Sequence, residues 1–266
     1  MKILIADPAK NITVFVLDAV DDSAERSSLA RAILEDEKLK AEQLGFVSAP
    51  SEHSNGLWRL DMSGGEFCGN AARSFGLYVA GIQGLKGKGT VFVSVSGADK
   101  PVPVHFDTER SFARAEMPKP LVVKNIDYKG RSLPLMVFEG ITHVIAPDLE
   151  ADRENFFSIK LIAESGLSEA NIPAAFGVMF YDTVSLFLRP AVSVRSGGNL
   201  VFESSCGSGS AALGVWLSRE MSDGAFSFPI TQSGGVIETE VTKKAGEIIS
   251  ITIGGELKLG KAFEFP

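Results

Sequence analysis

The sequence predicts an α+β protein made of two similar halves, and three observations support this prediction. Short runs rich in Val, Ile and Phe recur along the chain and favour strands, with a few helical stretches between them. The two cysteines, Cys68 and Cys206, lie in similar sequence contexts about half the chain apart. Hydrophobic residues make up 45% of the 266 positions, which is enough for one large core or two domain cores.

Composition and charge narrow the classes of function. The chain carries 33 acidic and 26 basic residues, for a net charge of −7, and has no Lys/Arg run. These values argue against nucleic acid or an anionic membrane as the main partner. No stretch approaches the roughly eighteen consecutive apolar residues of a membrane span, and the first residues do not resemble a signal peptide. We therefore expect a cytoplasmic protein that acts on a small molecule.

The order of elements is similar on the two sides of a proline-rich linker at 117–120, where two prolines resist both helix and central strand. Before the linker, a helix is expected at 23–43, where Ser23 can cap it, and strands at 2–6, 12–18, 44–48, 57–62, 90–96, 101–106 and 111–117. After the linker, helices are expected at 154–166 and 207–219, and strands at 121–124, 134–138, 142–146, 176–180, 183–188, 199–203, 236–242, 248–253 and 257–264.

An internal repeat links the segments 67–80 and 205–218. The cysteine, the glycine after it and a later glycine coincide, and the apolar positions of the two segments follow each other. Each segment therefore reads as a cysteine followed by small residues and an apolar helix. The two cysteines occupy equivalent places in the two halves.

The start of each helix suits the binding of a carboxylate next to a thiol. Free N–H groups and the positive dipole end bind anions, so the backbone donors of Gly69, Asn70, Gly207 and Ser208 are expected to hold a carboxylate. The same field lowers the pKa of a neighbouring thiol and favours its thiolate. Two such units suit the inversion of a stereocentre, because one thiolate removes the Cα proton and the other thiol returns a proton to the opposite face. This chemistry requires no cofactor.

Other interpretations of the same residues remain open. Each cysteine taken singly fits a buried structural thiol, although their matching places in the repeat favour a functional pair. The segment 207–212, Gly-Ser-Gly-Ser-Ala-Ala, is similar to the Gly-x-Gly-x-x-Ala pattern of a dinucleotide-binding loop but lacks a convincing βαβ unit. Thiol–disulfide chemistry and simple binding of small carboxylates are further alternatives. A metal site is not expected, because neither cysteine has a second thiol nearby and the histidines form no ligand pattern.

The segments 66–73 and 205–209 resemble the two cysteine motifs of the diaminopimelate epimerase family, which are amino-acid racemases and epimerases that work without pyridoxal phosphate. The resemblance implies two pseudo-symmetric halves, each a β-barrel-like sheet wrapped around a central helix. The halves would be 1–117 with Cys68 and 118–257 with Cys206, with the last strand at 258–266 returning to the first half. The resemblance also implies that the protein is a homodimer and needs no cofactor.

The resemblance extends to further site residues. Asn11 resembles an early asparagine of the family that contacts substrate, and the pair Glu42 and Gln43 resembles the Asp-Gln segment of the family. His143 falls where the family has a histidine that supports the first cysteine. By its position alone, three residues before the second cysteine, Glu203 is either a group that orients or polarises that thiol or an outward-facing strand residue. These residues join the two cysteines as candidate catalytic and substrate-binding groups.

Departures from the family pattern concern the substrate. The Glu-Arg pair that precedes the second cysteine in diaminopimelate epimerases is replaced at Gly197 and Gly198, with Arg195 close by, and Gly177 stands where the family has a substrate-binding asparagine. A site without these donors would bind the distal groups of diaminopimelate poorly. The segments 42–46 and 203–209 resemble instead the histidine racemases that feed opine-type metallophore synthesis.

Histidine is therefore the expected substrate. The alternatives are a diaminopimelate epimerase, an allylic isomerase of the same fold like the phenazine-pathway members, or a protein that only binds small carboxylates.

Overall fold

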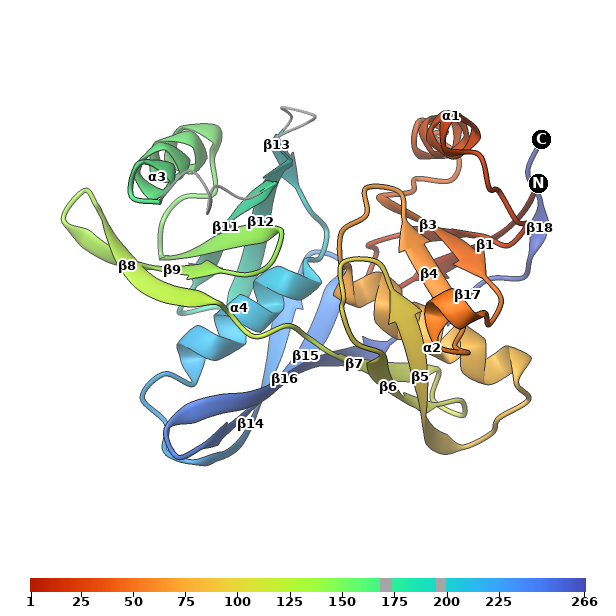
Figure 1. Cartoon of the computed structure of the whole chain (residues 1–266). Helices are drawn as coiled ribbons and strands as arrows, with labels where there is room; N and C mark the ends of the chain where they lie inside the picture. Colours follow the sequence, from red (N-terminus) through yellow and green to blue (C-terminus); the bar gives the residue numbers. More distant parts are fainter. Residues whose placement is uncertain (168–173, 195–199) are drawn as a thin grey trace. The chain divides into compact units, whose positions relative to one another are not determined.

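The computed structural model describes residues 1–167, 174–194 and 200–266 and has an α+β fold in which strands predominate (Figure 1). The chain divides into two compact units, each with its own core. Unit 1 comprises Met1–Glu116 and Gly254–Pro266, and unit 2 comprises Met117–Ile253. Among the described residues, no helix has the length and hydropathy needed to cross a membrane.

In unit 1, each of the two α-helices connects two parallel strands. Its elements are β1 (Lys2–Asp7), β2 (Thr13–Val16), α1 (Ser23–Leu34), β3 (Gln43–Ser48), the 3₁₀ turn η1 (Glu52–Ser54), β4 (Arg59–Met62), α2 (Gly69–Ile82), β5 (Lys88–Val95), β6 (Val102–Asp107), β7 (Phe112–Glu116), β17 (Lys258–Leu259) and β18 (Phe263–Glu264). Strands β2 and β3 are parallel across α1, and β4 and β5 are parallel across α2. The pairs β1–β2, β3–β4, β5–β6 and β6–β7 are antiparallel.

Strand β2 is covered on both faces, which explains why all four of its residues are buried. Phe15 faces α2, where its ring meets the edge of Phe75 at 5.8 Å between centroids. Val14 and Val16 point to the other face and join a core cluster with Ile33 of α1. The strands of unit 1 therefore separate α1 from α2 (Figure 1).

Unit 2 repeats this order of elements. They are β8 (Val122–Tyr128), β9 (Arg131–Val137), β10 (Ile141–Pro147), α3 (Arg153–Ser165), β11 (Ala175–Asp182), β12 (Phe187–Val194), β13 (Leu200–Phe202), α4 (Gly207–Leu217), β14 (Gly224–Gln232), β15 (Gly235–Lys244) and β16 (Glu247–Glu256), whose last residues belong to unit 1. Strands β10 and β11 are parallel across α3, and β12 and β14 are parallel across α4. The pairs β9–β10, β11–β12 and β14–β15 are antiparallel, as in unit 1.

The later glycine of each cysteine motif has the same packing role in its unit. Gly76 of α2 lies against Val104 in β6, and Gly214 of α4 lies against Thr239 in β15, so closely that a Cβ atom at either glycine would clash. Strands β6 and β15 hold equivalent places in the two orders of elements. The internal repeat therefore reflects the close approach of each helix to its sheet.

The two ends of the chain lie side by side in unit 1 (Figure 1). Strands β17 and β18 both pair antiparallel with β1, and the amino group of Met1 donates to the carbonyl of Phe265 at 3.1 Å. The C-terminal segment thus completes the sheet begun by the first strand.

Three expectations about secondary structure were wrong. The helix expected at 23–43 ends at Leu34, because the chain must turn back to pair Gln43 with Thr13, and the Asp36 carboxylate accepts the Lys38 N–H at 2.7 Å in that turn. The strand expected at 183–188 is a turn. The Asp182 carboxylate accepts the N–H groups of residues 184 and 185 there, and β12 begins only at residue 187. Strand β14 was not expected.

Candidate active site

Both cysteines are N-cap residues with nearly the same backbone conformation. Cys68 precedes α2 with φ −117° and ψ 111°, and Cys206 precedes α4 with φ −125° and ψ 114°. Each Sγ accepts the backbone N–H three residues on, from Ala71 at 3.5 Å and from Gly209 at 3.4 Å. The residues expected to bind a carboxylate, Gly69 with Asn70 and Gly207 with Ser208, form the first positions of these helices.

A closed set of hydrogen bonds fixes the backbone of Cys206. Its N–H donates to Gln232 Oε1 at 2.8 Å, and Gln232 Nε2 donates to Ser210 Oγ at 2.9 Å. The Ser210 hydroxyl then donates to the Cys206 carbonyl at 2.7 Å. Gln232 is the last residue of β14, so the strand that sequence patterns missed supplies a group that positions the cysteine.

Ser208 connects Cys206 with His143. Its Oγ lies 2.9 Å from His143 Nε2 and 3.6 Å from the Cys206 Sγ. His143 is fully buried in β10, and burial lowers the pKa of its imidazole to about 3, so the ring is neutral at neutral pH. The resemblance suggested a histidine that supports the first cysteine, whereas hydrogen bonds in unit 2 link His143 with the second.

The thiol of Cys206 is less acidic than the helix start alone would make it. Burial raises the pKa of Cys206 well above its ordinary value, and the negative charge and hydrogen bond of Glu203 raise it further. The Ser208 hydroxyl and the Gly209 N–H act in the opposite direction but are outweighed. The pKa of Cys206 is therefore raised, whereas the field of the helix start alone was expected to lower it.

In unit 1 the predicted polar residues gather beside the start of α2. Asn11 Nδ2 donates to Glu42 Oε2 at 2.7 Å, and Asn70 Nδ2 donates to Asn11 Oδ1 at 3.2 Å. The backbone N–H groups of Glu42 and Gln43 both donate to the carbonyl of residue 12, at 2.9 and 3.0 Å. Cys68 itself is half-buried.

Arg73 is a residue of this region that sequence reasoning missed. It is fully buried in α2, where its Nε donates to Asn70 Oδ1 at 3.1 Å and its Nη1 donates to the Gly255 carbonyl at 3.0 Å. The signal was present in the sequence, because Arg73 is the one charged residue in the apolar segment 69–82. Arginine is seldom fully buried without hydrogen-bonding partners.

The positions at which the sequence departs from the diaminopimelate epimerase pattern are not part of the hydrogen bonds described above. Arg195, Gly197 and Gly198 are outside the described residues. Gly177 lies on β11 beside His143, where a Cβ atom would meet the imidazole.

Among residues 1–167, 174–194 and 200–266, no group of three or more His, Cys, Asp and Glu side chains could hold a metal ion.

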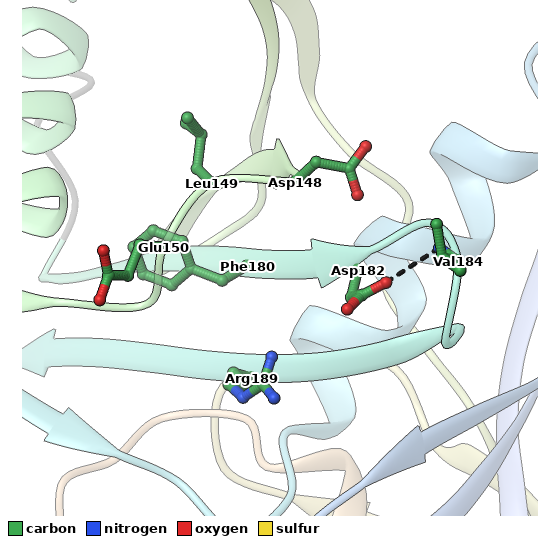
Figure 2. Close-up of a pocket in the computed structure, with 7 residues that line it drawn as sticks. All are labelled: Asp148, Leu149, Glu150, Phe180, Asp182, Val184 and Arg189. Carbon is green, nitrogen blue, oxygen red and sulfur yellow. Dashed lines mark hydrogen bonds between the residues drawn. The ribbon is translucent and has the colours of Figure 1, made fainter.

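Figure 2 shows a hollow in unit 2 that contains neither cysteine. It has a volume of about 440 Å³ and is lined by three carboxylates and Arg189. Two of the carboxylates are used in the β11–β12 turn: Asp148 accepts from the Thr183 backbone and hydroxyl, and Asp182 accepts from Val184. These acids therefore stabilise a turn.

Comparison with known proteins places the chain among racemases. Residues 2–263 match the family model described as the histidine racemase CntK N-terminal domain. The chain is 33% identical over 220 residues to a histidine racemase from Fusobacterium nucleatum, covering 80% of this chain and 79% of that protein. It is 26% identical over 240 residues to a histidine racemase from Staphylococcus aureus, covering 87% of this chain and 85% of that protein.

The fold has solved counterparts. A probable proline racemase from Agrobacterium radiobacter superposes with a TM-score of 0.65 at 18% identity, over 100% of this chain and 92% of that one. A putative phenazine biosynthesis PhzC/PhzF protein from Clostridium difficile gives a TM-score of 0.64 at 12% identity, over 100% and 99% of the two chains. At these identities the likeness concerns the fold.

Proposed function

The chain belongs to the histidine racemase family and is an isomerase, and from that premise we propose that it racemises histidine without a cofactor, with Cys68 and Cys206 as its acid and base. The observation that carries the proposal is the matched pair of cysteines. Both cap an apolar helix at equivalent places of an internal repeat, with the same backbone conformation and the same Sγ hydrogen bond.

The proposed reaction moves one proton in each half-step. A cysteine thiolate takes the Cα proton and becomes a thiol, and the electron pair of the broken C–H bond remains on the substrate as a carbanion conjugated with the carboxylate. The other thiol then gives its proton to the opposite face of Cα and becomes a thiolate. The enzyme ends with the two protonation states exchanged, so the opposite enantiomer restores them.

The two cysteines have different environments, which suits one of them to remove the Cα proton and the other to donate a proton. Burial and Glu203 keep Cys206 protonated at rest, which fits the proton donor of the first half-step. Cys68 is half-buried and is therefore assigned the removal of the Cα proton of the enantiomer that binds this resting form. Ser208 supports Cys206 by donating to its thiolate once the proton has left.

The remaining candidate residues are assigned to substrate binding or to support of a thiol. The N–H groups at the starts of α2 and α4, from Gly69, Asn70, Gly207 and Ser208, would stabilise negative charge on the substrate carboxylate. Asn11, Glu42 and Gln43 would contact the rest of the amino acid, Glu203 would polarise Cys206, and His143 would support it through Ser208. These roles rest on hydrogen bonds within each unit and on the family resemblance.

Broader features of the proposal follow from the family. Each half is proposed to be a β-barrel-like sheet around a central helix, α2 or α4, with residues 1–117 and 258–266 in one half and 118–257 in the other. Helix α2 packs against β5, β6 and β7, and α4 packs against β10, β11, β14 and β15, which supports this description. We further propose a homodimeric cytoplasmic enzyme that supplies D-histidine for metallophore synthesis.

Proton NMR of the reduced protein with single L-amino acids in D₂O tests the proposal. Histidine should lose its Cα proton signal and chiral chromatography should show the D form, whereas meso-diaminopimelate should not exchange. Both changes should vanish in Cys68→Ser and Cys206→Ser, and circular dichroism should show that the variants remain folded.

Other outcomes of the same experiment support other functions. Exchange of diaminopimelate alone would indicate an epimerase of that substrate. Binding of an amino acid without any Cα exchange, while both thiols are free, would refute racemisation and favour a carboxylate-binding protein. Activity that requires a Cys68–Cys206 disulfide would indicate thiol–disulfide chemistry.

A further inference from the structure

A continuous row of hydrogen-bonded side chains runs through unit 1 from a buried guanidinium to a carboxylate. Arg73 donates to Asn70, Asn70 donates to Asn11, and Asn11 donates to Glu42, at 3.1, 3.2 and 2.7 Å. Arg73 is fully buried, while Asn70 and Asn11 are 2% and 3% exposed. The row therefore begins with a cation in the core and ends at a residue assigned above to substrate binding.

The charges at the two ends determine how both amides are turned. A guanidinium only donates hydrogen bonds, so the oxygen of Asn70 must face Arg73 and its nitrogen must face Asn11. The oxygen of Asn11 must then face Asn70, which directs its nitrogen to Glu42. An ionised carboxylate only accepts hydrogen bonds, so the far end requires the same orientation. Both ends of the row thus specify one arrangement.

We propose that Arg73 is a positioning residue, which acts through Asn70 and Asn11 to hold the Glu42 carboxylate in place for the positively charged part of the substrate. This inference rests on the proposed function, in which Glu42 contacts the amino acid. It assigns a role to a residue that does not itself belong to the candidate site. The second bond of Arg73, to the Gly255 carbonyl, holds its guanidinium in the required direction.

Loss of the guanidinium leaves the two amides oriented from the Glu42 end alone, and turning Asn70 over then no longer breaks a hydrogen bond to a cation. Asn70 can then turn over, because its oxygen and nitrogen are nearly equal in size. If Asn70 turns over, Asn11 must follow, and its oxygen meets the Glu42 carboxylate, where the two acceptors repel each other. Glu42 then leaves its position, although Arg73 never touches it in this row.

A double-mutant cycle on substrate affinity tests this inference. The variants are Arg73→Met, Glu42→Gln and the double variant, and the readout is KM and kcat for L-histidine from Cα exchange in D₂O. We expect Arg73→Met to raise KM about tenfold with Glu42 present, which is the loss of one charge-assisted hydrogen bond. With Gln at position 42 we expect less than about a twofold effect, because a neutral amide accepts either orientation of Asn11.

Ser74→Ala is the matched control. Ser74 is fully buried in the same helix and donates to the backbone carbonyl of Asn70 at 2.8 Å, without touching the Asn70 side chain. Loss of this hydrogen bond in Ser74→Ala should lower the free energy of unfolding and leave KM for L-histidine unchanged. Arg73→Lys keeps the charge with a less suitable geometry and should give an intermediate KM. If Arg73→Met does not fold, the cycle with Arg73→Lys provides the same comparison.

Equal increases in KM with Glu and with Gln at position 42 would overturn the inference, since a merely structural role of Arg73 acts in both backgrounds alike. A change in kcat alone would also overturn it. These results are distinct from failure of the proposed function. In that case wild-type protein with free thiols would exchange no Cα proton at all, and the proposal and the role of Arg73 would fall together.

Discussion

The buried imidazole of His143 makes the stability of this protein depend on pH in a defined direction. Burial lowers its folded-state pKa to about 3, against 6.5 in the unfolded chain. Below pH 6.5 the unfolded chain therefore takes up a proton that the folded protein does not, and the free energy of unfolding decreases as the pH falls toward 3. Above pH 6.5 neither state is protonated, and the contribution is constant.

The size of this effect follows from the shift. A pH of 5 lies 1.5 units below the pKa of 6.5 that the imidazole has in the unfolded chain. At 1.36 kcal/mol per unit, the free energy of unfolding is therefore lower at pH 5 by about 2 kcal/mol. In His143→Gln the titrating group is gone. Its free energy of unfolding should therefore decrease by about 2 kcal/mol less than that of the wild type between pH 8 and pH 5.

Urea unfolding at the two pH values, followed by circular dichroism, measures this difference. The exposed His53 supplies the control, because His53→Asn removes a histidine without removing a buried one. It should show the same pH dependence as the wild type. Equal pH dependence of the wild type and His143→Gln would refute the argument, because it would mean that His143 takes up a proton in the folded protein as readily as in the unfolded chain.

Three further predictions concern the two cysteine motifs. Iodoacetamide should modify Cys68 before Cys206 at pH 7.5, because Cys206 is 6% exposed and burial raises its pKa. Peptide mass spectrometry measures the order, and modification of Cys206 first would contradict its assignment as the resting thiol. Ser208→Ala removes a donor that lowers the pKa of Cys206, so the pH–rate profile of racemisation should move to higher pH, and an unchanged profile would exclude this role. Gly209→Ala would place a Cβ atom against Met179 Sδ and should destabilise the protein by about 1–3 kcal/mol in thermal unfolding. The control Gly81→Ala, at a helical position with open space, should be neutral or stabilising by up to about 1 kcal/mol, and similar losses in both variants would contradict the packing argument.

The helices that carry the cysteines could be predicted because local sequence determines them. A cysteine followed by glycine and small residues caps an apolar segment, and the same pattern occurs twice, so α2 and α4 begin where expected. The end of α1 and the strand β14 depend on distant partners. The segment after Leu34 carries helix-favouring residues, but pairing of β3 with β2 forces a turn there. Strand β14 contains Pro229, which argues against a strand, yet it pairs along its length with β15.

Two features of the candidate site could not be predicted from local sequence. The field of a helix start suggests an acidic thiol, but burial and Glu203 raise the pKa of Cys206, and burial is a property of the whole unit. Arg73 is in the core because Asn70 and the Gly255 carbonyl, far along the chain, accept its hydrogen bonds. Sequence alone identified Asn11 and Glu42 through the resemblance, but not the guanidinium to which their row leads.

The residue two places after each cysteine differs between the two halves of the repeat. In unit 1 it is Asn70, whose side chain turns away to Arg73 and Asn11. In unit 2 it is Ser208, whose hydroxyl lies 3.6 Å from its own cysteine. Two-base racemisation pairs one thiolate with one thiol. We infer that burial and Glu203, and not the residue two places after the cysteine, make Cys206 the resting thiol, because the Ser208 hydroxyl acts to lower the pKa of Cys206, and that Ser208 instead stabilises the thiolate formed after Cys206 has given up its proton.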